Sequence, residues 1–85
     1  MMDGFNILSL NVRGTIKNPE QRGKLLALVE INKINVLLLQ ETHVNNLNIK
    51  ETIDKIFNCN SYWSFGSNNS RGVAILIMNN FEKNN

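Results

Sequence analysis

Two polar side chains follow the two most apolar stretches in the first half of the chain. Asn11 comes directly after residues 7–10, and Glu41 follows residues 36–39 with one residue, Gln40, between them. In open α/β sheets, ligands bind beyond the carboxyl ends of the strands. Amide and carboxylate oxygens are hard donors that Mg²⁺ accepts, so this pair indicates a divalent metal site. The alternative is that Glu41 lies in solvent and Asn11 begins a turn, and spacing alone favours this alternative.

Other residue types give weaker indications of chemistry. His43 is the only histidine, and a lone histidine in a loop is more often a surface residue than a catalytic base. The aspartates Asp3 and Asp54 do not lie in a pattern from which a nucleophilic triad can be assembled. The sequence also has no glycine-rich phosphate loop leading into a helix.

A strand, a helix and a second strand are expected to position Asn11 and Glu41. Residues 5–12 are apolar on both faces of the predicted strand, which is typical of a central strand. Asn18 and Pro19 are typical of the start of a helix, and residues 36–39 are typical of a buried strand. Two strands joined by one helix predict a right-handed βαβ unit. The apolar residues of the predicted helix are Leu25, Leu26, Leu28 and Val29.

A second helix and a hairpin are predicted in the second half of the chain. Asn48 followed by Glu51 is a capping pattern, and the apolar residues that follow recur at helical spacing. Aromatic residues at 61–65 and β-branched residues at 73–78 flank a turn-rich segment, which predicts a hairpin. Tyr62 and Trp63 offer surfaces on which a base could stack, but we expect them in the core. The apolar residues of this helix are Ile49, Ile53, Ile56 and Phe57.

Composition places the chain among globular proteins. Its 85 residues are 42% hydrophobic and 19% charged, so we expect one small domain covering residues 1–85. The net charge of +2 comes from basic residues spread along the chain, which argues against a purely electrostatic nucleic-acid binder. The single cysteine, Cys59, cannot form an internal disulfide, and no apolar run approaches the length of a membrane span. We therefore expect an intracellular protein with no membrane partner.

Four short motifs occur in an order and spacing that resemble a known family. They are N-V-R-G at residues 11–14, N-P-x-x-R at 18–22, Q-E-T-H at 40–43 and R-G-V-A-I-L at 71–76. Together they resemble the endonuclease/exonuclease/phosphatase family, also called DNase-I-like. Within that family they look like the apurinic-type endonuclease domain of non-LTR retrotransposon polyproteins, which also carry a reverse transcriptase.

The resemblance implies a fold and a set of site residues. The fold would be α/β, namely the N-terminal part of a four-layer α/β sandwich with the element order β-α-β-α-β-β. Glu41 would bind Mg²⁺, or Mn²⁺ in its place, with Asn11 beside it as a metal-binding and catalytic residue. Arg13, His43 and Arg71 would be weaker contacts to nucleic acid, and the complete domain would hydrolyse DNA phosphodiesters in the nucleus or cytoplasm.

Part of the family pattern has no counterpart here. The resemblance spans roughly the first third of the family's domain, and the later Asp-x-Asn and Ser-Asp-His motifs do not occur. We therefore expect the chain to be inactive alone, with DNA and the rest of the domain as its partners. Two alternatives stay open, namely a non-catalytic α/β interaction module and a phosphoesterase of the same family that acts on small or lipid substrates.

A partial sandwich should also leave one face of its sheet uncovered. Side chains alternate between the two faces of a strand, so residues 73–78 divide into two sets. We expect one of these sets to be largely exposed to solvent. The sets are Val73, Ile75 and Ile77, or Ala74, Leu76 and Met78.

Overall fold

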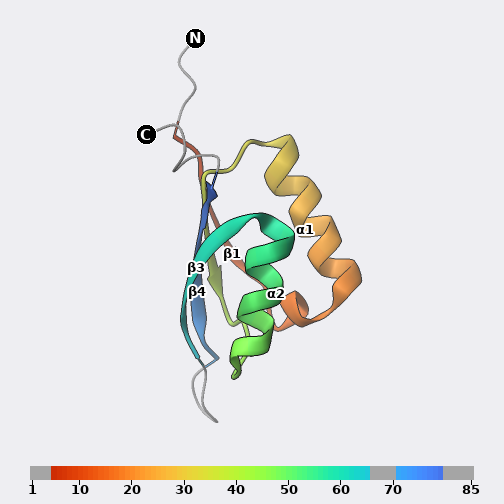
Figure 1. The fold of residues 1–85 in the computed structure, drawn as a ribbon, viewed down its shortest axis with the longest axis vertical. Helices are drawn as coiled ribbons and strands as arrows, with labels where there is room; N and C mark the ends of the chain where they lie inside the picture. The colour runs from red at the N-terminus through yellow and green to blue at the C-terminus, as the bar shows by residue number, and fades with distance from the viewer. Residues whose placement is uncertain (1–4, 66–70, 80–85) are drawn as a thin grey trace.

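The structure, a computed structural model, describes residues 5–65 and 71–79. It is a small mixed α/β domain with four strands and two α-helices (Figure 1), and it confirms the predicted order β-α-β-α-β-β. Neither helix is long and apolar enough to cross a membrane. The elements are β1 (Ile7–Asn11), the short 3₁₀ helix η1 (Thr15–Lys17), α1 (Pro19–Ile31), β2 (Val36–Gln40), α2 (Leu47–Phe57), β3 (Cys59–Ser64) and β4 (Val73–Met78).

The four strands form one mixed sheet in the order β1-β2-β4-β3. β1 and β2 are parallel neighbours, as the predicted βαβ unit requires, while β4 is antiparallel to both β2 and β3. The prediction that the first strand is central was wrong, because β1 lies at an edge of the sheet. Its apolar pattern on two faces has another cause. Leu8 and Leu10 pack towards the core, while Ile7 lies on the opposite face and is 54% exposed.

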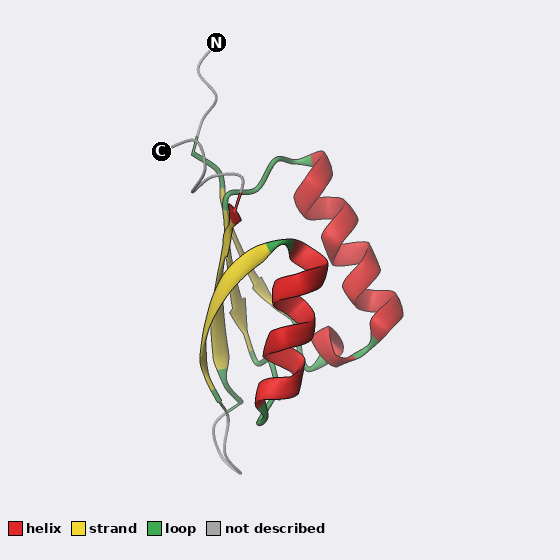
Figure 2. Ribbon diagram, in the orientation of Figure 1, coloured by secondary structure: helices red, strands yellow, loops and turns green. Residues whose placement is uncertain are grey.

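Both helices cover the same face of the sheet (Figure 2). The core lies between the helices and this face, and it draws residues from every element except β1. Leu8 and Leu10 of β1 pack against the core from its margin. The buried apolar residues are Ile16, Val29, Leu37, Leu39, Val44, Ile53, Phe57, Cys59, Ala74, Leu76 and Met78.

The opposite face of the sheet, which we call the outer face, is not covered by any part of the chain that the structure describes. Along β4, Ala74 and Leu76 are buried, whereas Val73 is 49% and Ile75 is 42% exposed. The expectation of one exposed set is thus confirmed for Val73 and Ile75, while Ile77 is half-buried. Strand register and alternation define the outer face as Ile7, Ser9, Asn11, Val36, Leu38, Gln40, Asn60, Tyr62, Ser64, Val73, Ile75 and Ile77.

The helix starts follow from their capping residues. Asn18 caps α1, because its side chain accepts a hydrogen bond from the backbone N–H of Gln21 at 3.0 Å, as its position before a proline predicts. The predicted start of the second helix was two residues late, because Asn46 is the N-cap of α2. The Asn46 side chain accepts from the N–H groups of Asn48 and Ile49, so Asn48 lies within the first turn.

The predicted hairpin is present, with β3 and β4 paired antiparallel, and residues 66–70 of its turn lie outside the described residues. The expectation that Tyr62 and Trp63 are both core residues was wrong for Tyr62, which is 58% exposed. Adjacent strand residues point to opposite faces, so burial of Ser61 on the helix side places Tyr62 on the outer face. Trp63 is half-buried and packs against the core.

Candidate functional site

Asn11 and Glu41 meet at the carboxyl ends of two neighbouring strands. β1 and β2 are parallel, and Asn11 is paired with Gln40, so the residue after Gln40 lies beside Asn11. The Asn11 side-chain amide Nδ2 donates a hydrogen bond to Glu41 Oε2 at 2.7 Å. The expectation that these two residues lie together at one edge of the sheet is confirmed, and their catalytic and metal-binding roles stay predictions.

The backbone around this pair adopts conformations that side chains disfavour. Arg13, Glu41 and His43 have φ angles of 48°, 53° and 55°, in the left-handed region. Such conformations cost of order 1–3 kcal/mol each in non-glycine residues, and they cluster at functional sites. Contacts with other segments hold the loop after β2 in place: the Gly14 N–H donates to the Glu41 carbonyl at 2.8 Å, and the His43 N–H donates to the Arg71 carbonyl at 2.8 Å.

Gly14 lies where two features of the structure favour glycine. Its φ of 78° lies in the left-handed region. A Cβ at this position would also lie 3.1 Å from Nδ1 of the His43 ring, which is closer than an ordinary contact. The absence of a side chain at Gly14 therefore lets the histidine ring lie against the loop after β1.

Basic groups surround the Glu41 carboxylate. Arg71 donates from its guanidinium Nη1 to Glu41 Oε1 at 3.2 Å, and His43 Nε2 lies 3.9 Å from the same oxygen. The hydrogen bond from Asn11 is the largest cause of the shift in the pKa of the Glu41 carboxyl, and it lowers that pKa. Burial, the second-largest cause, raises it, and Arg71 and then Arg13 each lower it by a smaller amount. Glu41 is therefore a carboxylate at neutral pH.

The contacts of Asn11 assign it to positioning Glu41. Its amide nitrogen donates to Glu41, and its Oδ1 accepts from the backbone N–H of Arg13 at 3.1 Å. Direct binding of a metal by Asn11, as the resemblance implies, would have to use the second lone pair of this oxygen. The Arg13 side chain forms no ion pair with the described carboxylates within 4.0 Å, so of these two arginines Arg71 is the one in contact with Glu41.

The described residues offer Mg²⁺ few protein ligands. Within residues 5–65 and 71–79, no group of three or more His, Cys, Asp or Glu residues could hold a metal ion. Mg²⁺ is often bound through one or two carboxylates, with waters and substrate phosphates completing its octahedron. Glu41, whose side chain is 30% exposed, fits this mode as a single protein ligand.

Three features of the site were not predicted from the sequence. Gln40 donates from Nε2 to Ser9 Oγ at 2.7 Å, which adds a second polar link between the ends of β1 and β2. Thr42 is fully buried, and its N–H donates to the Gly72 carbonyl at 3.2 Å. Arg71, whose side chain is 64% exposed, forms an ion pair with Glu41. The sequence places Arg71 thirty positions from Glu41, and no local pattern relates the two.

Comparison with known proteins gives no further assignment. Neither a protein-family model nor a curated protein matches this sequence.

Proposed function

We propose that this chain is the N-terminal part of a Mg²⁺-dependent endonuclease of the endonuclease/exonuclease/phosphatase family, of the type found in retrotransposon polyproteins. Glu41 is the metal ligand, and Asn11 is the residue that orients it. The observation that carries the proposal is the 2.7 Å hydrogen bond between Asn11 Nδ2 and Glu41 Oε2 at the ends of two parallel strands.

Convergence of separate motifs supports this proposal. Asn11 and Arg13 belong to the first of the four motifs, Glu41 belongs to the third and Arg71 begins the fourth. The Glu41 carboxylate accepts from both Asn11 and Arg71, and the pKa of Glu41 is lowered by both and by the nearby charge of Arg13. Residues from three segments of the chain thus act on one carboxylate, which is typical of a site that uses that carboxylate.

In the proposed reaction, the metal and the residues of the chain have separate roles. Bound Mg²⁺ supplies a Lewis acid for hydrolysis of a phosphodiester. Glu41 holds the ion as a carboxylate, and Asn11 fixes the carboxylate's orientation. The guanidinium groups of Arg13 and Arg71 have the charge and geometry that bind phosphate oxygens. The general base comes from the remainder of the domain, so the isolated chain does not cleave DNA.

One observation favours a second candidate, the non-catalytic interaction module. Both oxygens of Glu41 already have partners in the chain, with Arg71 on Oε1 and Asn11 on Oε2. In this second candidate, the ion pair between Arg71 and Glu41 has a purely structural role, which is to join the loop after β2 to the segment before β4. In that case Glu41 binds no metal, and the contact is structural.

Metal titration followed by NMR separates the two candidates. Mn²⁺ added to the isotopically labelled chain should broaden the backbone signals of Asn11 and Glu41 first, and excess Mg²⁺ should reverse the effect. Glu41→Gln should abolish the selective broadening, while Glu51→Gln, an exposed carboxylate change on α2, should not. Equal broadening around Glu51 and Glu41, or none at Glu41, would contradict the proposed metal site.

Plasmid nicking tests the second half of the proposal. The chain alone should show no Mg²⁺-dependent nicking, because removing single members of a catalytic constellation already costs orders of magnitude in rate. Mg²⁺-dependent nicking that is lost in Glu41→Gln would show that the residues needed for cleavage are all present in this chain.

A further inference from the structure

Two groups of different charge hold the Glu41 carboxylate. The guanidinium Nη1 of Arg71 donates to Oε1 at 3.2 Å, whereas the neutral amide of Asn11 donates to Oε2 at 2.7 Å. A divalent cation can share a carboxylate with a neutral amide, but it repels a guanidinium that contacts the same carboxylate. Arg71 and a metal ion would therefore compete for Glu41, whereas Asn11 and a metal ion would not.

The backbone of Arg71 is joined to the loop that carries Glu41. The Arg71 carbonyl accepts from the His43 N–H at 2.8 Å. The Gly72 carbonyl that follows accepts from the N–H of Thr42 at 3.2 Å, and Thr42 is fully buried. Neither contact uses the Arg71 side chain. If the guanidinium left Glu41, the backbone of Arg71 would therefore stay in place, and the guanidinium would stay beside the site.

The side chain of Arg71, in contrast, is held loosely. It is 64% exposed within the described part of the chain, whereas the Glu41 side chain is 30% exposed. Breaking the ion pair therefore removes little packing from Arg71. A released guanidinium keeps its charge and its planar fork of donors, which match the oxygens of a phosphate group.

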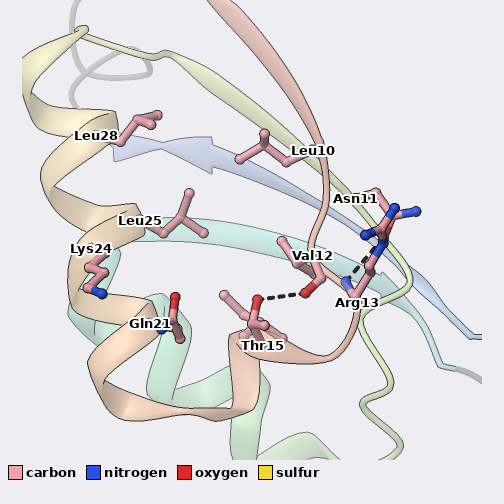
Figure 3. Close-up of a pocket in the computed structure, with 10 residues that line it drawn as sticks. Leu10, Asn11, Val12, Arg13, Thr15, Gln21, Lys24, Leu25 and Leu28 are labelled. Atoms are coloured by element: carbon pink, nitrogen blue, oxygen red, sulfur yellow. Dashed lines mark hydrogen bonds between the residues drawn. The ribbon is translucent and has the colours of Figure 1, made fainter.

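Arg13, the other arginine near this carboxylate, has different contacts. Figure 3 shows Asn11 and Arg13 at one side of a cavity of about 390 Å³ between β1 and α1, with the Arg13 N–H donating to Asn11 Oδ1. The charge of Arg13 lowers the pKa of Glu41 less than the charge of Arg71 does. Of the two arginines, Arg71 is therefore the one that would have to leave Glu41 when a cation binds there.

We propose that Arg71 couples the binding of the metal at Glu41 to the binding of the phosphodiester, an inference that rests on the function proposed above. Without substrate, the guanidinium holds the carboxylate and weakens its affinity for a divalent cation. When metal and phosphodiester are both present, Arg71 leaves Glu41 and donates to a phosphate oxygen. The negative charge of the phosphate then lies between two positive groups that otherwise repel each other.

The coupling predicts effects of opposite sign in the two states. With Mg²⁺ alone, removing the charge of Arg71 should strengthen Mg²⁺ binding, because a competing cation is lost. With a phosphodiester present, the same change should remove the gain in Mg²⁺ affinity that the phosphodiester produces, since coupling between two ligands is reciprocal. An arginine that only orients Glu41 would give the opposite result with Mg²⁺ alone, because its removal would weaken binding.

The test measures Mg²⁺ affinity at pH 7 from the side-chain carboxyl ¹³C signal of Glu41. With Mg²⁺ alone, Arg71→Gln should bind at least about fivefold more tightly than the wild type. Arg71→Lys, which keeps the charge, should restore the weaker binding of the wild type. Lys55→Gln is the matched control, because it removes the same charge from an exposed residue in the last turn of α2, and it should also bind like the wild type.

The second arm repeats the titration with the thymidine dinucleotide TpT, which is a phosphodiester anion. TpT should raise the Mg²⁺ affinity of the wild type by at least about fivefold, and that of Arg71→Gln by less than about twofold. An equal gain in both proteins would overturn the coupling. Absence of a gain in the wild type would overturn it without reference to any variant, so the test holds even if Arg71→Gln fails to fold.

The coupling and the metal site fail in different ways. If Mg²⁺ binds at Glu41 but binds no more tightly in Arg71→Gln than in the wild type, the coupling is overturned and the metal site stands. Tighter binding in Arg71→Lys or Lys55→Gln as well as in Arg71→Gln would also overturn it, because the charge at position 71 would not be the cause. If neither the wild type nor Arg71→Gln binds Mg²⁺ at Glu41, the proposed metal site is contradicted and the coupling with it.

Discussion

The two helices cover the same face of the sheet but are attached to it in different ways. α2 buries Ile53 and Phe57. A polar network also links α2 to β3, because Asp54 accepts from Lys50 Nζ at 2.8 Å and from the buried hydroxyl of Ser61. The indole Nε1 of Trp63 donates to that hydroxyl at 2.7 Å, so the network extends along β3.

α1 has much weaker attachments. Val29 is its one buried residue, while Leu28 is 40% and Ile31 is 78% exposed. Its polar link runs to η1, because Arg22 Nη1 donates to the carbonyls of Ile16 and Lys17 at 3.2 and 3.1 Å. The Nε atom of Arg22 is buried without a hydrogen-bond partner in the structure.

This difference divides the domain into a flank with a firmly attached helix and a flank with a loosely attached helix. On the flank of α2, β3 and β4 a polar network joins helix and strand, whereas the flank of β1 and α1 has, among the described residues, an unpaired strand edge and a cavity. Asn11 lies on the open flank and reaches Glu41 at its boundary with the rest of the sheet. Functional segments are commonly drawn from the less stable parts of a fold, so the candidate site lies where this principle expects it.

The largest expected difference between the flanks concerns thiol reactivity. Burial raises the pKa of the Cys59 thiol to about 12, with Asp54 adding to the effect, from an ordinary value of 9.0. The reactive thiolate is therefore scarcer by about a thousandfold, and alkylation by iodoacetamide at pH 8 should slow by at least that factor. Leu28→Cys in a Cys59→Ala background should react at the rate of a free thiol. Similar rates for the two thiols would show that the α2 flank is as open as the α1 flank.

Truncation of one apolar side chain on each helix should also separate the flanks. Ile53 on α2 is fully buried, so Ile53→Ala should lower the free energy of unfolding by about 2–5 kcal/mol. Leu28→Ala on α1 should lower it by less than about 1 kcal/mol, because Leu28 is already 40% exposed. Urea denaturation followed by circular dichroism measures both. Equal losses for the two variants would remove the distinction between the flanks.

A smaller effect is expected from the polar network of α2. Asp54→Ala removes the acceptor of the buried Ser61 hydroxyl, and should destabilise the domain by about 1–3 kcal/mol. Glu51→Ala on the exposed side of the same helix is the matched control, and should change stability by less than about 0.5 kcal/mol. If Asp54→Ala behaves like this control, the network contributes nothing to the attachment of α2.

Local patterns in the sequence were sufficient to predict the elements and their order. The helix start at Asn18 and Pro19 could be predicted because capping depends on adjacent residues. Period-2 alternation likewise predicted that one face of β4 would be exposed. The meeting of Asn11 and Glu41 could be anticipated because parallel neighbouring strands end at the same edge of a sheet.

Properties that depend on distant partners could not be predicted. The position of β1 at the sheet edge depends on which strands pair, and an apolar strand pattern does not specify its neighbours. The left-handed backbone at Glu41 could not be predicted from the sequence, because glutamate is not a residue type that favours this conformation. The ion pair of Arg71 with Glu41 follows from the pairing of β2 with β4, which is a tertiary feature.

The central claim is that Asn11 and Arg71 hold Glu41 as an anion at the ends of β1 and β2. Since the folded-state pKa of Glu41 is lowered, its ionised form adds stability above the ordinary value of 4.5, and this stability is lost as the pH falls through the folded-state pKa. The carboxylate state is also the one that a divalent cation requires.

The most direct test follows the side-chain carboxyl ¹³C signal of Glu41 by NMR from pH 7 to pH 2, in the wild type and in Asn11→Ala. The wild-type signal should titrate below 4.5, and Asn11→Ala should move its midpoint upward, because the hydrogen bond from Asn11 is the largest cause of the shift. A Glu41 midpoint at or above 4.5, or one unchanged by Asn11→Ala, would contradict this claim.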